Sequence, residues 1–182
     1  MELGQVLPIA LAGLLAVALL ALLRRAGATV ARVREVEGFR HAVSALEQEV
    51  DRQLGGWIER IDAVRRGQAQ PGEVVDDFAA ALRTLDGFAG ASRAIETPPA
   101  FVPTQDAYTA ELERAARSLA MVEHGCRVLV SAGGHHRQLE ATTAIKRGYL
   151  NLLHSRTALQ EHAELIATAR DPLQHRWRTS RI

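Results

Sequence analysis

The chain has 182 residues, of which 24% are charged and only 4% aromatic, and its formal net charge is +1. This length suits one modest domain. The near-neutral charge argues against electrostatic capture of nucleic acid, and the few aromatic side chains argue against a stacking surface for single strands or sugars. A single cysteine excludes an internal disulfide framework and a multi-cysteine zinc site. We expect no nucleic-acid partner.

The clearest signal is an apolar N-terminal segment. Residues 6–23 contain no charged or strongly polar side chain and, with the three preceding residues, reach the length that crosses a hydrocarbon core of about 30 Å. The alternative is a cleaved signal peptide, because residues 26–28 (Ala-Gly-Ala) resemble a cleavage site. Such peptides begin with positive charges, which are absent here, and Arg24 and Arg25 directly follow the apolar run. The sequence therefore predicts an uncleaved transmembrane anchor over residues 1–23.

A basic juxtamembrane segment, residues 24–34, follows the anchor. The N-terminal flank of the apolar run has no lysine or arginine. Residues 24–34, in contrast, carry four arginines: Arg24, Arg25, Arg32 and Arg34. Because positive residues favour the cytoplasmic side of a membrane, we expect the N-terminus outside. The sequence thus predicts a single-pass protein of the cell membrane with most of its chain in the cytoplasm.

Residues 35–170 are predicted to form a helical unit that begins with a long helix continuing from the anchor. Its apolar residues recur every three or four positions at Val36, Phe39, Val43, Leu46, Val50, Leu54, Trp57, Ile61 and Val64. Two consecutive four-residue steps around Val50, beside Gly55 and Gly56, predict a bend or a close helix contact there. Charges of alternating sign on this helix are typical either of a solvated face or of a coiled-coil face that selects a second copy as its partner, and the sequence leaves both open.

Glycine and proline divide the rest of the unit. Residues 67–72 (GQAQPG) end the first helix, and a second helix is expected from about Glu73 to just before Thr97. Its predicted buried residues are Val74, Phe78, Leu82, Leu85, Phe88 and Ile95. The stiff linker that follows, through Phe101 and Val102, is expected to pack over one end of the unit.

The third helix is expected to open at Thr104 as its N-cap and to end at Gly133 and Gly134. Its predicted buried residues are Tyr108, Leu112, Ala115, Leu119, Val122, Cys126 and Leu129. The fourth helix is expected over residues 136–170, with its stripe at Leu139, Thr142, Ile145, Tyr149, Leu152, Leu159, Ala163 and Ile166. No strand-like alternation competes, so the predicted fold is all-α: a transmembrane helix followed by an antiparallel four-helix bundle.

The C-terminal tail, residues 171–182, is basic and contains a tryptophan. Arginine beside an interfacial tryptophan suits an anionic headgroup layer. We therefore predict a second set of membrane-interface residues at Arg176, Trp177, Arg178 and Arg181, with a disordered basic terminus as the alternative. Both basic segments would then flank the membrane, with the acidic helical unit away from it.

No residue pattern points to catalysis, a metal or a cofactor. The seven histidines lack the one-face spacing with carboxylates that a helical metal site needs, and no Gly-x-Ser-x-Gly turn is present. Cys126 lies on an apolar stripe and is expected to be a core residue. Arg156 falls where the fourth stripe expects an apolar side chain. With Thr142, Thr143 and Lys146, it indicates either a polar pocket or partner contact, or side chains that reach solvent at the edge of the unit.

We therefore expect a non-enzymatic scaffold or interaction module whose partners are the lipid bilayer and a second copy or another membrane protein. The alternative is a tethered extracytoplasmic helical domain that binds a small ligand or metal through its histidines. A third interpretation, an all-helical metalloenzyme, requires a bound metal. The topology of the chain distinguishes the first two.

Overall fold

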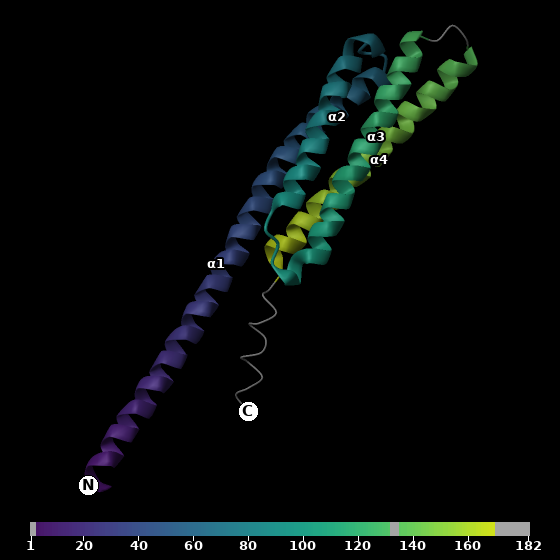
Figure 1. Ribbon diagram of the computed structural model, residues 1–182. Coiled ribbons are helices and arrows are strands. Elements are labelled where there is room, and N and C mark those ends of the chain that lie inside the picture. The colour runs from purple at the N-terminus through teal and green to yellow at the C-terminus, as the bar shows by residue number, and fades with distance from the viewer. Residues whose placement is uncertain (1–2, 132–134, 170–182) are drawn as a thin grey trace. The chain divides into compact units, whose positions relative to one another are not determined.

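The structure, a computed structural model, describes residues 3–131 and 135–169, and in these ranges it contains helices and no strand (Figure 1). The elements are α1 (Leu3–Arg65), α2 (Pro71–Ala94), the short 3-10 helix η1 (Pro99–Phe101), α3 (Val102–Ser131) and α4 (His135–Thr168). The all-α prediction with four main helices is therefore confirmed. The chain divides into two compact units, residues 1–38 and residues 39–182.

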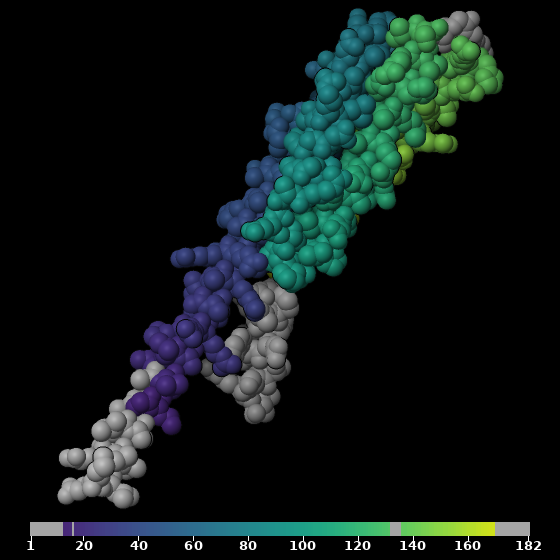
Figure 2. All heavy atoms as spheres, viewed as in Figure 1, coloured from purple at the N-terminus to yellow at the C-terminus, as the bar shows by residue number. Residues whose placement is uncertain are grey.

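The second unit is built around one apolar core to which α1, α2, α3 and α4 all contribute. Its largest fully buried side chains include Leu54 and Ile61 from α1, Phe78 from α2, Tyr108 from α3 and Leu152 from α4. Figure 2 shows the side chains of α2 and α3 closely packed on the face of this unit that is in view. The three- and four-residue spacing of apolar positions thus identified the faces that form the core.

The predicted stripe of α1 is largely confirmed, with one addition. Phe39, Val43, Val50, Leu54, Ile61 and Val64 are buried, as predicted. Ile58, outside the predicted stripe, is buried as well, whereas Val36, Leu46 and Trp57 are only half-buried. At Gly55, the guanidinium of Arg156 on α4 lies 3.7 Å from where a Cβ would stand, which is an ordinary van der Waals distance to a side chain; the predicted bend or close helix contact stays a prediction.

The turn between α1 and α2 follows from its glycine and proline. Gly67 adopts φ +70°, a left-handed conformation that ends a helix, and its N–H donates to Val64 O at 3.1 Å. The second helix begins at Pro71, slightly before the predicted Glu73, because the fixed φ of proline and its missing N–H suit the first helical position. The Glu73 carboxylate accepts the N–H of Gln70 at 3.2 Å, which closes this end of α2.

The predicted N-cap at Thr104 is wrong. Helical structure starts earlier, with η1 from Pro99 running into α3 at Val102, because prolines are accommodated in the first turns of helices. The linker does pack over one end of the core. Phe101 is buried against Phe39, with ring centroids 5.2 Å apart, and the guanidinium of Arg40 lies 5.8 Å from the centroid of the Phe101 ring.

Two glycines bring α3 and α4 into close contact. A Cβ on Gly125 would lie 2.8 Å from Ile145 Cγ1 and 2.9 Å from Ala141 O. A Cβ on Gly148 would lie 2.7 Å from Ser118 O. Since the later glycine meets the earlier residues of α3, the two helices run in opposite directions.

This contact also corrects the start of the predicted α4 stripe. Leu139 is 57% exposed and Thr142 is exposed, whereas Ala141 is buried together with Ile145. Because Gly125 has no side chain, Ala141 and Ile145 pack directly against it. The face of α4 that carries these two residues is therefore turned toward the core, and Leu139 is turned outward. Further along, Leu152, Leu159 and Ile166 are buried as predicted.

Candidate functional site

The first unit consists of the N-terminal part of α1, and its apolar side chains have no protein partner in the described region. Seven leucines and valines between residues 14 and 23 are each 57–72% exposed: Leu14, Leu15, Val17, Leu19, Leu20, Leu22 and Leu23. Within the described part of the chain, α1 is the one helix long and apolar enough to cross a membrane. Contiguous exposed apolar surface of this kind marks a contact with lipid or protein, so this segment is the candidate functional site.

Four basic residues follow the apolar run on the same helix. Arg24, Arg25, Arg32 and Arg34 all lie on α1 and are exposed. At about 100° per residue they spread over about half of the helix circumference, whereas the exposed leucines and valines of residues 14–23 face every side of the helix. A helix that lies flat on a membrane has one apolar face and one charged face. An uncharged run that is apolar on every side and is followed by arginines is instead typical of a spanning segment.

The other predicted membrane-interface residues, Arg176, Trp177, Arg178 and Arg181, lie outside the described residues. Their role at the bilayer surface stays a prediction.

Arg156 forms a cross-helix ion pair in the second unit and does not simply reach solvent. Its Nε donates to Asp51 Oδ1 at 2.6 Å and its Nη2 to Asp51 Oδ2 at 3.0 Å, and Gln160 Nε2 also donates to Asp51 Oδ1 at 2.8 Å. The hydrogen bond from Arg156 lowers the pKa of Asp51, whereas burial and the charge of Asp51 raise the pKa of Glu47. This ion pair joins α1 to α4, and each of its two side chains is about a third exposed to solvent.

The remaining polar residues that the sequence singled out on α4 are solvent-facing. Thr142 and Thr143 are exposed, and their hydroxyls donate to backbone carbonyls one turn back at 2.7 and 2.8 Å. Lys146 is exposed as well. These three residues and Arg156 therefore do not converge on a common site.

Cys126 is confirmed as a core residue. Its side chain is fully buried, and burial, with a smaller contribution from Glu123, raises the pKa of its thiol to about 11. The thiolate, which is the reactive form, is therefore scarce near neutral pH.

The histidines that the structure describes form no metal-binding group. In residues 3–131 and 135–169, no three His, Cys, Asp or Glu side chains are grouped so that they hold a metal ion. His136 lies beside Glu140, with Nδ1 and Oε1 3.4 Å apart, on an exposed part of α4. His162 has a buried Nδ1 for which no hydrogen-bond partner is present among the described residues.

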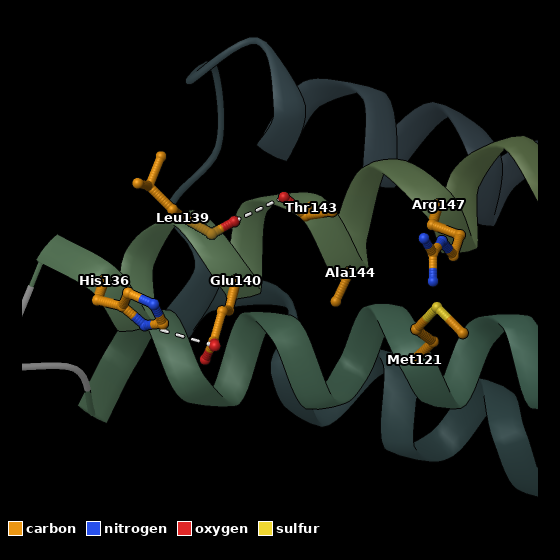
Figure 3. A pocket seen from close by; sticks show the side chains of 7 residues that line it. All are labelled: Met121, His136, Leu139, Glu140, Thr143, Ala144 and Arg147. Carbon is orange, nitrogen blue, oxygen red and sulfur yellow. Dashed lines mark hydrogen bonds and ion pairs between the residues drawn. The ribbon is translucent and has the colours of Figure 1, made fainter.

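One surface depression, of about 390 Å³, lies between α3 and the first turns of α4 (Figure 3). Apolar atoms of Met121, Leu139 and Ala144 line it, and the guanidinium of Arg147 lies close to the Met121 side chain. The contact between His136 and Glu140 lies at its far end.

A second depression, of about 380 Å³, lies between the end of α2 and the start of α3. Three buried polar residues, Ser92, Gln105 and Thr109, contribute to its lining. Sequence reasoning missed this group. The available signal was that all three polar residues fall on helix faces that otherwise carry core residues.

Comparison of the chain with protein-family models, curated proteins and solved structures gave no match. Function is therefore inferred from the geometry of the chain itself.

Proposed function

We propose that the chain is a single-pass membrane protein anchored by the N-terminal part of α1. The observation that carries this proposal is the exposure of every large apolar side chain between residues 14 and 23. The helix begins at Leu3, so residues 3–23 span about 31 Å at 1.5 Å per residue, which matches a bilayer core. Their backbone groups are paired within the helix, as a lipid environment requires.

The orientation that we propose places the N-terminus outside and the second unit in the cytoplasm. What supports it is the group of four arginines after the apolar run, Arg24, Arg25, Arg32 and Arg34, because the residues before the run include no lysine or arginine and one acidic residue, Glu2. We further propose that the second unit is an antiparallel four-helix bundle. Arg60 near the end of α1 pairs with Asp77 near the start of α2, and Arg93 at the end of α2 pairs with Glu113 in the first half of α3. Between α1 and α4, Asp51 pairs with Arg156 and Arg40 donates to Ile166 O, so residue numbers fall along α1 as they rise along α4.

We propose that this unit acts as a non-enzymatic scaffold or interaction module for a partner protein or a second copy. What supports this role is that α1, α2, α3 and α4 share one apolar core and carry exposed charged side chains of both signs. Such a surface selects partners through charge pattern. Its test is purification of the tagged chain from detergent-solubilised membranes beside a version truncated after residue 38. Recovery of the same proteins with both versions would contradict the proposal.

The anchor is tested by placing charge in the apolar run. An arginine near the centre of a spanning helix costs about 2.5–3.5 kcal/mol, so Leu15→Arg combined with Leu19→Arg should release the chain from membranes into the alkaline-wash supernatant. Leu139→Arg is the matched control, because Leu139 is equally exposed but lies on α4. The proposal fails if the wild-type chain is itself extracted by alkaline carbonate, or if the double variant stays bound like the control.

The orientation is tested separately with a reporter fused at Ile182. The proposed topology gives activity from a reporter that works in the cytoplasm and none from one that works only outside it. The opposite result would overturn the cytoplasmic assignment and favour an extracytoplasmic ligand-binding domain.

A further inference from the structure

The part of α1 that follows the apolar run is not packed against the other described residues. Residues 24–35 are all exposed, and Val30 and Val33 are 53% and 44% exposed although they lie beyond the predicted anchor. Gly27, Thr29 and the valines are weaker helix formers than alanine, and an isolated helix of this length is marginal in water. A contact along one face would stabilise this part of α1.

Uncharged residues form one stripe with strict heptad spacing along this part of α1 and the apolar run before it. Steps of four and three alternate through what we call the heptad stripe: Leu15, Leu19, Leu22, Ala26, Thr29, Val33 and Val36. A repeat of 3.5 residues is the pattern of a left-handed coiled coil. Six of these residues are exposed and Val36 is half-buried. The Thr29 hydroxyl donates to Arg25 O at 3.0 Å, so the one polar group on the stripe already has a hydrogen bond.

The charged residues between 24 and 38 all avoid the heptad stripe. With Ala26 and Val33 at heptad position a, three of these charges fall on the outer positions b, c and f, and three fall on the flanking positions e and g. The outer ones are Arg34, Glu35 and Arg24, and the flanking ones are Glu37, Arg25 and Arg32. An uncharged seam with charges at its edges is typical of a dimeric coiled coil.

The flanking charges are complementary in a parallel pair of identical helices. In such a pair, a residue at position g lies beside the e residue that comes five positions later on the other helix. Arg32 therefore faces Glu37 of the second copy, and symmetry makes this pair twice. Arg25 faces the uncharged Val30, so no like charges oppose each other. In the described part of the chain, neither Arg32 nor Glu37 makes an ion pair.

The heptad stripe is open only as far as the second unit. Its next two positions are Arg40 and Val43. Arg40 Nε donates to Ile166 O at 3.1 Å, and Val43 is buried. Both residues are therefore engaged within the second unit, which confines the surface that another helix can use to residues 15–36.

Lipid does not account for the exposed valines of this surface. Val33 lies about 15 Å beyond Leu23 along the helix axis, whereas the headgroup layer is only about 5–7 Å thick on each side of a bilayer. Lipid covers the leucines of the apolar run, but the stretch around Val33 faces water unless a protein covers it. The edge charges, Arg32 and Glu37, indicate that the covering helix has the same charge pattern.

We propose that two copies of the chain pair in parallel through the heptad stripe, residues 15–36. This inference rests on the proposed function, because two chains anchored in one membrane with the same orientation bring their stripes together only in parallel. In this arrangement each copy covers Ala26 and Val33 of the other, and Arg32 lies beside Glu37 of the second copy.

The pairing is tested by cysteine crosslinking of the full chain in isolated membranes, with copper phenanthroline as the oxidant. Ala26→Cys places a thiol on the heptad stripe, whereas Ala28→Cys places one on the opposite face. Ala26→Cys should form disulfide-linked dimers at least about tenfold faster, because only its thiols meet at bonding distance. Val33→Cys and Ala31→Cys repeat the comparison further from the membrane. Cys126 is fully buried, so the unsubstituted chain is the blank. Equal crosslinking on both faces, or none on either, would overturn the proposal.

The ion pair is tested by charge exchange, with dimer dissociation followed by analytical ultracentrifugation of the full chain in a neutral detergent. Arg32→Glu places like charges opposite each other and should raise the dissociation constant at least about fivefold. Adding Glu37→Arg restores opposite charges and should return the constant to its wild-type value. Arg34→Glu makes the same change on an outer position and should leave the constant unaltered. Absence of rescue, or equal weakening by Arg34→Glu, would refute the parallel register.

Failure of the pairing is distinguishable from failure of the anchor. If the wild-type chain resists alkaline carbonate but its two faces crosslink equally, the anchor stands and the pairing is refuted. If carbonate releases the wild-type chain, the anchor is refuted, and pairing within a membrane is refuted with it.

Discussion

The contact between α3 and α4 depends on two glycines, and Gly148→Ala tests it most directly. A Cβ at this position would lie 2.7 Å from Ser118 O and 2.6 Å from Val122 Cγ2. Ser118 O is a backbone atom, so it cannot move away as a side chain does. The helices would have to separate by about 0.7 Å to restore the ordinary contact of 3.4 Å.

The change in the free energy of unfolding caused by Gly148→Ala is the difference between two opposing effects. Alanine stabilises a helix by about 1 kcal/mol relative to glycine, whereas overpacking a close contact costs about 1–3 kcal/mol. We expect Gly148→Ala to be destabilising overall. Gly87→Ala, on α2 with nothing within 4 Å of its Cβ, is the matched control and should stabilise by about 0.5–1 kcal/mol. A difference of about 2 kcal/mol in stability between the two variants corresponds to roughly 4–8 °C in melting temperature for a chain of this size.

The assay is thermal unfolding of both variants in the same detergent, followed by circular dichroism. If Gly148→Ala melts at or above Gly87→Ala, the two helices are not in close contact and the reasoning fails. Gly125→Ala provides a second check, because its Cβ would meet Ala141 O at 2.9 Å. Once one substitution has separated the helices, the second costs less, so the double variant should be destabilised by less than the sum of the two.

Three further predictions concern buried or paired side chains. The hydroxyl of Tyr108 is buried and has no hydrogen-bond partner among the described residues, so Tyr108→Phe should leave the melting temperature unchanged or raise it; a loss of more than about 1 kcal/mol in stability would show that the hydroxyl has a partner. Arg156 lowers the pKa of Asp51, so their pair stabilises the fold above the ordinary aspartate pKa and loses this contribution as pH falls through the lowered value. The stability difference between the wild type and Asp51→Asn, about 1 kcal/mol near neutral pH, should therefore shrink below about pH 4, and a pH-independent difference would contradict the pairing. Burial raises the Cys126 pKa from 9.0 to about 11, so near pH 8 alkylation by iodoacetamide should be at least about a hundredfold slower in the folded chain than in urea, and equal rates would show an accessible thiol.

Apolar spacing predicted the helices and most of the core because every turn of a helix repeats the same face. Phe39, Leu54, Phe78 and Leu112 are buried as that spacing requires. Helix starts were less well predicted. At Thr104 a favourable N-cap residue was overridden by the prolines that precede it, Pro99 and Pro103, which allowed helical turns to begin earlier.

The candidate membrane segment was the part of the site that the sequence determined most fully. Length, lack of charge and flanking arginines are properties of residues 6–34 themselves and need no tertiary contact. The group of buried polar residues between α2 and α3 was not predictable in this way. Ser92, Gln105 and Thr109 come from two helices, and only their packing shows that their side chains hydrogen-bond to one another.

The sequence by itself thus determined the helical class, the apolar segment and the break at Gly67, because each depends on local periodicity, composition or backbone conformation. Tertiary structure alone decided the cross-helix features. Gly125 turns Ala141 inward and Leu139 outward, and Arg156 occupies an apolar position because Asp51 on α1 faces it. These outcomes depend on which residue of a distant helix stands opposite, and a pattern within one helix carries no information about its neighbour.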